Sequence, residues 1–252
     1  MHVCITADIE RFSDAITKFE CMYTINDARC IQILLDMFCD HDISSTLFLL
    51  GKAIVEEPAI FDMTRENGFE LASHGYTHID FRTLSSKELG EELEKSTRLF
   101  PVKGFRAPYY GFQPWMVQHL QHHFLYDSSK VSGRNKRLYY HTIHMLSDSL
   151  MEIPVSSMPF IPLPLTSTGI RWLPFTILKK IMNILIKKPQ PLILNIHPWE
   201  YIAIPQEVPV PFYVKKNTGR AFYATMQRLL TYLKNLDVEF NTMGEIYETQ
   251  RL

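Results

Sequence analysis

The stretch that decides the fold is FELASHGYTH at residues 69–78, a largely apolar run that closes on two histidines. Phe69–Ser73 has the length and the residues of a buried β-strand, and His74 and His78 follow it directly. Four other segments, far apart in the chain, repeat this arrangement of a strand-like run followed by polar residues: Asp8–Glu10, Arg106–Tyr109, Tyr126–Ser129 and His197–Glu200. A barrel of parallel strands gathers its strand ends on one face, so these segments can meet there. The pattern predicts an enzyme.

Strand-like runs alternate with helical ones along most of the chain. The strand-like runs are His2–Ala7, Ser45–Leu50, Phe69–Ser73, Val102–Arg106, Phe124–Asp127, Glu152–Ser156, Pro191–Ile196 and Val238–Asn241. Apolar residues with helical spacing lie at Asn26–Cys39, from Ser85 onward, at Phe175–Lys188 and at Asn217–Leu236. This alternation indicates a parallel sheet covered by helices. The sequence has no internal repeat and no linker, so we expect residues 1–252 to form one domain.

Two of the expected helices carry start signals. Asn26 is placed to cap the first of them. Ser85 and Glu88 have the spacing of a capping box at the start of another. That helix is expected to bury Leu89, Leu93 and Leu99.

The segment between Lys130 and Pro174 breaks the alternation. Prolines punctuate its apolar residues and exclude a long helix: Pro154, Pro159, Pro162, Pro164 and Pro174. A long irregular insert in a regular barrel is often a functional loop. An edge hairpin that plugs one end of the barrel explains the same composition equally well, and the sequence leaves both interpretations open.

Composition sets mild bounds on function. With 252 residues, 46% of them hydrophobic, the chain can build the core of one barrel-sized domain. A net charge of −1 gives no reason to expect nucleic acid as a partner. Neither a signal peptide nor an apolar run of about 18 residues is recognisable, which predicts a cytoplasmic protein without a membrane span. The cysteines lack C-x-x-C spacing and are expected to be reduced, mostly buried thiols: Cys4, Cys21, Cys30 and Cys39.

His74 and His78 carry the strongest chemical signal. A spacing of four places two imidazoles on the same side of a helical turn, where they can share one metal ion. Two neutral imidazoles need a carboxylate to complete the three-ligand open site of hydrolytic metal enzymes. Asp8 and Glu10 end the first strand, and alternate strand residues share a face, so both carboxylates can point into one mouth. Taken alone, this acidic pair is more simply explained as a solvated strand end.

Together these segments resemble the polysaccharide deacetylase family, whose catalytic unit is called the NodB-homology domain and is of the carbohydrate esterase family 4 type. The resemblance runs from Val3 to about Thr242 and rests on segments in the family's order: DIE at 8–10, TLFLLG at 46–51, GFELASHGYTH at 68–78, GFRAP at 104–108 and HPWE at 197–200. The Asp-x-Glu first motif and the His-Pro-Trp-Glu last motif resemble the branch associated with bacterial exopolysaccharide and lipid-linked sugar loci. The resemblance implies a distorted (β/α) barrel of about seven strands, similar to a TIM barrel. It also implies a divalent metal ion, with zinc as the first choice, and removal of acetyl from the nitrogen of an N-acetylated sugar.

The resemblance also implies roles for single residues. Asp8 matches the family's catalytic base, Arg106 matches the arginine that fixes the base, and His197 matches the general acid. His74 and His78 match its two metal-binding histidines.

Two motifs depart from the family's pattern. Most members carry Asp-Asp where this chain has Asp8-Ile9-Glu10, and we assign Glu10 as the third metal ligand. The alternative is a Glu10 that stays in solvent and leaves a weak two-histidine site. In the fourth motif Asp127 is present without the family's frequent Asp-Trp pair, which puts its supporting role, the orientation of His197, in doubt.

Aromatic residues beside these motifs suit contact with a sugar. Tyr109, Tyr110 and Trp199 are the candidates, and a backbone N–H near Tyr109 matches the family's usual donor to the oxyanion. Ordinary packing in a loop or in the barrel explains the same three side chains equally well.

The expected helix at Phe175–Lys188 sets apolar residues against Lys179, Lys180, Lys187 and Lys188. A basic amphipathic helix can lie on an anionic membrane surface, although a helix that merely covers the barrel is the simpler interpretation. Peripheral membrane contact therefore stands as a hypothesis. In the cytoplasm, a nucleotide-linked or lipid-linked N-acetylated sugar is a better candidate substrate than an assembled polysaccharide.

Two other functions stay open. The first is a metal-dependent amidase on a small non-sugar amide. A cleft that is narrow at both ends and lacks aromatic platforms would favour it, and Tyr109, Tyr110 and Trp199 argue against it. A non-catalytic carbohydrate-binding barrel would have lost its metal, and the joint presence of the five matched residues argues against that loss: Asp8, His74, His78, Arg106 and His197.

Overall fold

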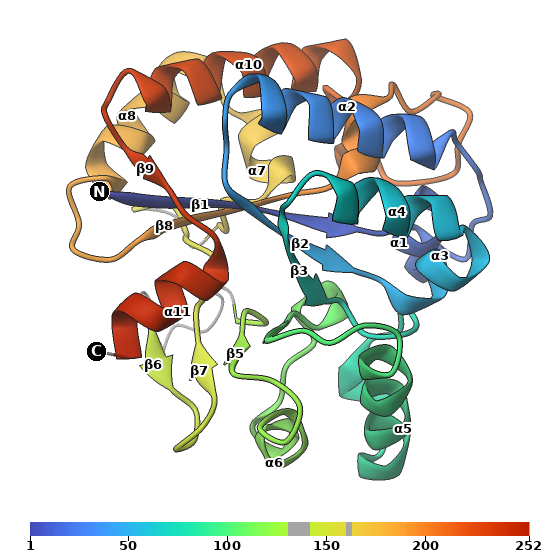
Figure 1. Cartoon of the computed structure of the whole chain (residues 1–252). Coiled ribbons are helices and arrows are strands. Elements are labelled where there is room, and N and C mark those ends of the chain that lie inside the picture. Colours follow the sequence, from blue (N-terminus) through green and yellow to red (C-terminus); the bar gives the residue numbers. More distant parts are fainter. Residues whose placement is uncertain (131–141, 160–162, 252) are drawn as a thin grey trace.

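A curled sheet of parallel strands forms the centre of the fold (Figure 1). The structure, a computed structural model, describes residues 1–130, 142–159 and 163–251. In these ranges the strands are β1 (His2–Ile9), β2 (Ser45–Leu49), β3 (Glu70–Ser73), β4 (Gly104–Phe105), β5 (Tyr126–Asp127), β6 (His144–Met145), β7 (Met151–Glu152), β8 (Leu192–Ile196) and β9 (Glu239–Phe240). Their order is β6-β7-β5-β4-β3-β2-β1-β8, with β9 beside the start of β1, and β6 alone runs antiparallel to its neighbour. This curled half-barrel confirms the predicted barrel-like α/β class.

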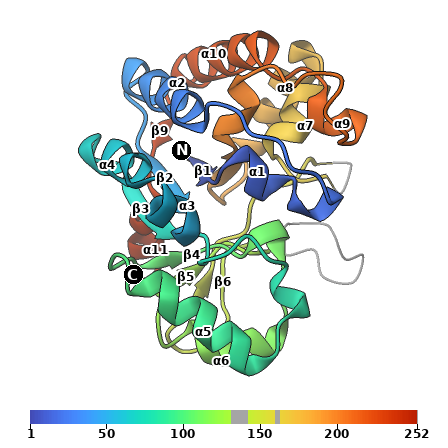
Figure 2. The same ribbon diagram turned by 90° about the vertical axis from the view of Figure 1, so that its right-hand side faces the viewer.

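Helices lie around the sheet (Figures 1 and 2). They are α1 (Phe12–Ala15), α2 (Asp27–Asp40), α3 (Gly51–Glu56), α4 (Pro58–Glu66), α5 (Ser86–Thr97), α6 (Val117–Leu120), α7 (Ser167–Trp172), α8 (Phe175–Leu185), α9 (Phe212–Lys215), α10 (Arg220–Lys234) and α11 (Met243–Arg251). In Figure 1, α2, α8 and α10 lie along one side of the β1 and β8 region. In Figure 2, α5 and α6 lie beside the β4 and β5 region.

Strand β1 shows how the sequence directs its side chains. Alternate strand residues face opposite sides of a sheet. Val3, Ile5, Ala7 and Ile9 belong to the apolar core that includes buried residues of α2 and α10. The intervening positions face the inside of the curled sheet, where Cys4 packs near its base and Thr6 and Asp8 follow toward the mouth. The period of two in β1 therefore places Asp8 inside the barrel.

The start signals of both capped helices are confirmed. Asn26 accepts a hydrogen bond from the backbone N–H of Arg29 at 3.0 Å, and Ser85 and Glu88 form the capping box at the start of α5. Leu89 and Leu93 are buried as expected. The prediction for Leu99 was wrong, because α5 ends at Thr97 and Leu99 lies beyond it, 38% exposed.

The described parts of the proline-rich segment have a feature of each interpretation, the edge hairpin and the loop at the barrel mouth. Residues 131–141 and 160–162 lie outside the described part of the chain. Strands β6 and β7 pair antiparallel at the edge of the sheet, as an edge hairpin would. The stretch from Leu163 to α7 instead lines a cleft at the mouth of the barrel, and Thr166 pairs with Asn195 of β8.

Helix α8 is amphipathic, as predicted. Its buried side chains are Leu178, Ile181, Met182 and Leu185, and Lys179 lies with its Nζ 4.5 Å from the ring centre of Tyr232 in α10. These contacts are those of a helix that covers the sheet, and contact with a membrane stays a prediction. Within the residues that the structure describes, no helix is both long and apolar enough to cross a membrane.

The four cysteines are free thiols, in agreement with the sequence. Cys4, Cys21 and Cys30 are buried and Cys39 is exposed.

Candidate active site

The polar segments that follow the strands meet at the carboxyl end of the sheet. Asp8 and Glu10 end β1, His74 follows β3, and His197 follows β8. Together with His78 they line a cleft of about 620 Å³. The structure thus brings together residues that are far apart in the sequence, at the edge that parallel strands share.

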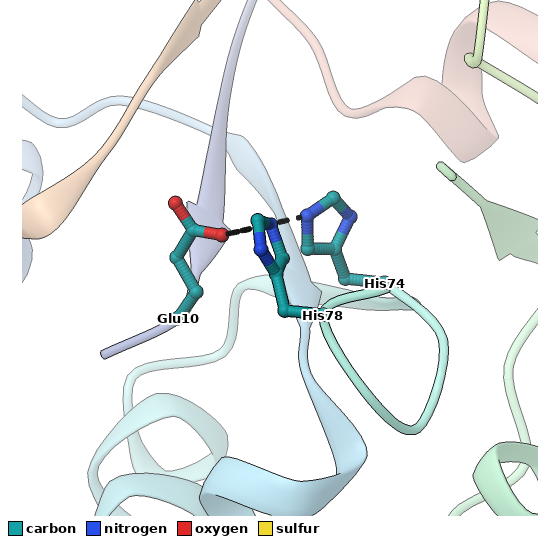
Figure 3. A group of neighbouring side chains, drawn as sticks. All are labelled: Glu10, His74 and His78. Carbon is teal, nitrogen blue, oxygen red and sulfur yellow. Dashed lines mark ion pairs between the residues drawn. The ribbon is translucent and has the colours of Figure 1, made fainter. Parts of the chain in front are cut away.

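Glu10, His74 and His78 form a compact cluster (Figure 3). Oε2 of Glu10 lies 2.5 Å from Nε2 of His78 and 3.8 Å from Nε2 of His74. One donor atom from each residue lies within 4.8 Å of the other two. All three side chains are almost completely buried, so the alternative of a solvent-exposed Glu10 does not apply.

Second contacts hold the two imidazoles in a ligating orientation. Nδ1 of His74 donates to the backbone carbonyl of Arg106 at 2.9 Å, which leaves the Nε2 lone pair directed at Glu10. Nδ1 of His78 is 2.9 Å from the hydroxyl of Tyr109. The other oxygen of Glu10 accepts a hydrogen bond from Trp199 Nε1 at 3.2 Å. Metal-binding histidines and carboxylates are commonly fixed by such outer contacts.

A loop, and no helical turn, brings the two histidines together, which corrects the sequence-based expectation. Residues 74–78 have no helical structure. Gly75 has a φ of +79°, a conformation that favours glycine, and a Cβ there would lie 2.8 Å from Cζ of Phe81. The glycine lets the chain reverse after His74 and return His78 to the same side.

Asp8 is held through both of its oxygens. Oδ1 accepts from Nη1 of Arg106 at 2.8 Å, and Oδ2 accepts from Nδ2 of Asn195 at 2.8 Å. Burial by itself raises the pKa of Asp8, but the Arg106 guanidinium, with smaller contributions from His74 and His197, outweighs burial and holds that pKa far below its usual value. Asp8 is therefore a carboxylate at neutral pH.

Arg106 is fully buried and has a partner for each part of its guanidinium. Nη1 also donates to Oγ1 of Thr6 and Oδ1 of Asn195, while Nε and Nη2 donate to the carbonyl and hydroxyl of Ser128. Its guanidinium carbon lies 4.0 Å from the ring centre of Phe48.

Sequence reasoning missed Thr6, Ser128 and Asn195 as members of this network. Thr6 precedes Asp8 by two positions on one strand, and Asn195 precedes His197 by two at the end of another. The same alternation that placed Asp8 inside the barrel was the signal that would have found both.

His197 lies between the carboxylates and the wall of the cleft. Its Nε2 is 3.6 Å from Oδ2 of Asp8 and 3.9 Å from Oε1 of Glu10. Its Nδ1 is 3.1 Å from Oγ of Ser167 and 3.5 Å from Oε2 of Glu200. Burial lowers the pKa of His197, yet the nearby carboxylates of Asp8, Glu200 and Glu10 outweigh it and raise that pKa to about 10. The imidazole is therefore protonated beside an ionised Asp8.

The three predicted aromatic residues contact other side chains of the site instead of forming an open surface for a sugar. Tyr109 binds His78, and Tyr110 accepts a hydrogen bond from Asn195 through its hydroxyl at 2.8 Å. Both tyrosines have positive φ values, 55° and 53°, which is strained for bulky residues and typical of functional loops. Trp199 is 7% exposed and stacks on His197, with ring centres 5.4 Å apart. A more exposed ring on the cleft wall belongs to Tyr213, which contacts the ring of Phe19.

Asp127 is not placed to orient His197. In the described structure its Oδ1 accepts from the hydroxyl of Ser129, and its other partner is the buried Glu152 of β7. The orienting contacts on His197 come from Ser167 and Glu200 instead. Burial raises the pKa of Asp127 to about 6, and burial with the neighbouring Asp127 charge raises the pKa of Glu152 well above its usual value.

This buried acid pair predicts a pH-dependent stability. When folding raises the pKa of a carboxyl group, ionisation of that group lowers the free energy of unfolding. The loss grows as the pH rises from the pKa of the unfolded state to that of the folded state. Glu152→Gln removes one charge while its amide can donate to Asp127. We expect the free energy of unfolding to rise by about 1 kcal/mol or more at pH 8, with a smaller change at pH 5. Denaturant unfolding at both pH values checks this, with the exposed Glu66→Gln as control; an equal change at pH 5 and pH 8 would contradict it.

Two family models match adjoining parts of the chain. Residues 14–122 match a family model described as polysaccharide deacetylase, and residues 128–248 match a domain of unknown function, DUF3473. A peptidoglycan deacetylase-like protein of Gibberella zeae is 34% identical over 103 residues, which are 38% of this chain and 30% of that protein. The chain spans less than a third of the length of the curated relatives that it matches.

Solved structures share the fold. A Mycobacterium smegmatis protein assigned as a polysaccharide deacetylase has a TM-score of 0.68 at 18% identity, over 99% of this chain and 90% of that one. The structure of the allantoinase Puue has a TM-score of 0.66 at 15% identity, over 98% of this chain and 89% of that one. The chain carries the polysaccharide deacetylase match in residues 14–122, followed by the DUF3473 match in residues 128–248.

Proposed function

We propose that the chain is a metal-dependent hydrolase that removes an acetyl or similar acyl group from the amide nitrogen of an N-acetylated sugar. One observation carries the proposal most: Oδ2 of Asp8 and Nε2 of His197 lie 3.6 Å apart beside the Glu10, His74 and His78 cluster. Amide hydrolysis needs a base for the attacking water and an acid for the departing amine, and this pair supplies opposed protonation states.

The residues of the cluster fit a divalent ion. Oε2 of Glu10 is buried and has no hydrogen-bond partner among the described residues, although two imidazole nitrogens face it. Two imidazoles and a carboxylate are a donor set that zinc accepts with positions left open. A bound ion would polarise the acyl carbonyl and lower the pKa of water from 15.7 toward about 7.

Asp8 would take the proton of the attacking water. Arg106 and Asn195 hold its two oxygens, so the carboxylate cannot rotate away from the cleft. His197 would deliver a proton through Nε2 to the amine as the carbon–nitrogen bond breaks. The backbone N–H of Tyr109 would donate to the carbonyl oxygen as it gains charge, a contribution of about 3 kcal/mol for one such donor.

The walls of the cleft support a sugar as the substrate. Tyr213 is 44% exposed and, with Phe19, offers apolar surface at the edge of the cleft. The cleft of about 620 Å³ has room for a sugar unit. We propose a lipid-linked or nucleotide-linked precursor, or an oligosaccharide, as the form in which the sugar is presented.

A mass-spectrometric screen tests this function. N-acetyl sugars are offered in nucleotide-linked, lipid-linked and oligomeric forms to purified protein with one equivalent of zinc. The mass of at least one of them should fall by about 42 units, the change when one acetyl group is replaced by hydrogen. Turnover of small non-sugar amides in the same screen, with no sugar turned over, would favour an amidase instead.

The role of His197 predicts a dependence on the leaving group. His197→Ala should lower turnover of alkyl amides by about 10²–10⁴-fold, because an amine leaves badly without a proton. Esters with acidic leaving groups should be affected much less, and the metal content should stay unchanged. Comparing kcat on a matched amide and activated ester measures the difference, and equal losses on both would contradict the role of general acid.

A further inference from the structure

Glu200 is buried against the ring of His197. The two residues belong to the segment HPWE, and a short 3₁₀ turn over Pro198–Tyr201 brings the Glu200 carboxylate back toward the imidazole. Its Oε2 lies 3.5 Å from Nδ1 of His197 and has no hydrogen-bond partner among the described residues. The side chain has no exposed surface, so water does not compete for this oxygen.

Arg171 fixes the other oxygen of Glu200. Nε of Arg171 donates to Oε1 at 2.7 Å, and neither side chain of this ion pair is exposed. The guanidinium also donates to the backbone carbonyls of Lys216 and Tyr213, so that α7 is joined to the segment around α9. Arg171 therefore holds Glu200 from the side opposite His197.

A fully buried ion pair needs a reason beyond stability. Well-packed apolar residues of similar volume are often as stabilising as such a pair, because removing two charges from water is costly. The ion pair of Arg171 and Glu200 lies directly beside the imidazole of His197. Ser167, the first residue of α7, adds a hydroxyl at 3.1 Å from the same Nδ1. Two oxygen atoms thus face Nδ1, whereas Nε2 faces Asp8 and the cleft.

We propose that Glu200, held by Arg171, is the positioning residue of His197. Its carboxylate faces the Nδ1–H at 3.5 Å beside the Ser167 hydroxyl, holds the proton on Nδ1 and leaves Nε2 as the nitrogen that delivers a proton to the substrate. The proposal rests on the proposed function, in which His197 is the general acid. It assigns to Glu200 the orienting task that the sequence suggested for Asp127.

The proposal also gives the DUF3473 region a defined task. Ser167, Arg171, His197 and Glu200 all lie in residues 128–248, whereas the two histidines of the metal cluster lie in residues 14–122. The two regions would then build one active site together. The DUF3473 region supplies the residues that deliver the proton, and the first region supplies the two imidazoles of the metal cluster.

Glu200→Gln is the informative variant because it keeps the shape of the side chain. Arg171 can only donate, so the single amide oxygen should face Arg171 and the NH₂ group should face Nδ1, where it cannot accept a hydrogen bond. With zinc-loaded protein we expect kcat on an alkyl amide to fall about 10–100-fold, with KM within about twofold. Turnover of an activated ester should change less than about threefold, since its leaving group needs no proton. Glu200→Asp, which restores a carboxylate, should recover part of the amide turnover.

A spectroscopic measurement separates this proposal from the proposed function. In protein with ¹⁵N-labelled histidine, the His197 resonances, assigned through His197→Ala, should show Nδ1 as the protonated hydrogen-bond donor in the native protein. Glu200→Gln should shift the Nδ1 resonance and leave the other histidines unchanged. This result would support the positioning role even if no sugar were deacetylated, a failure that would count against the proposed function alone.

Three outcomes would overturn the positioning role. They are unchanged His197 resonances in Glu200→Gln, equal loss of amide and ester turnover, and full amide turnover. If Glu200→Gln does not fold, the double variant Arg171→Met with Glu200→Met removes both charges together and avoids a lone buried charge. We expect it to fold, to bind one equivalent of zinc and to lose amide turnover selectively; full amide turnover in this variant would also refute the proposal.

Discussion

Asp8→Asn protein is expected to bind its metal ion and to lose turnover by about 10²–10⁴-fold. The substitution preserves the shape of the side chain but removes the charge that takes a proton from water. Arg106 keeps an oxygen to bind, whereas the new NH₂ group meets the Nδ2 donor of Asn195. A modest loss of stability should accompany the loss of activity.

Metal analysis and steady-state kinetics on the same preparations measure this. The exposed Asp62→Asn on α4 is the control for the chemical change and should behave as the native protein. An Asp8→Asn enzyme with native turnover and a full complement of metal would show that another group acts as the base.

His74→Ala is expected to empty the metal site. Removal of one imidazole leaves a carboxylate and one histidine, too few protein ligands for a three-ligand site. We expect the zinc content after dialysis to fall from about one equivalent to below about a tenth, and turnover to fall by on the order of 10³-fold or more, since the metal contributes several kcal/mol to the transition state.

His122→Ala is the matched control, because His122 is exposed at the end of α6 and far in the sequence from the cluster. Zinc analysis of both variants after identical dialysis gives the comparison. A His74→Ala protein that still carried a full equivalent of zinc would remove His74 from the ligand set.

The sequence predicted the strands, and with them the place of the site, because their signal is local. Each polar segment directly follows an apolar run, and parallel strands of this length leave their ends at one edge. For the same reason the sequence predicted Asp8, Glu10, His74 and His197 as neighbours, and the structure brings them together.

The contacts that hold these residues were harder to predict, because they depend on tertiary structure. A spacing of four between His74 and His78 fits a helical turn and a glycine-containing loop alike, and the positive φ of Gly75 decides for the loop. Nothing near Glu200 in the sequence points to Arg171, which comes from the segment after the prolines. Asp127 lies at the expected strand end, but its side chain faces Ser129 and Glu152.

The position of β1 has a consequence for synthesis of the chain. It precedes β8 in the sequence by about 180 residues yet pairs with it, and the hydrogen bond between Asp8 and Asn195 joins residues 187 positions apart. Until β8 is synthesised, one edge of β1 lacks that neighbour, and an uncovered strand edge promotes aggregation. A fragment cut between the two family matches, after residue 122, should therefore be insoluble and inactive. The nascent chain should acquire catalytic competence only after β8 and the following His197 have left the ribosome, as expected for a topology dominated by late, non-local pairing.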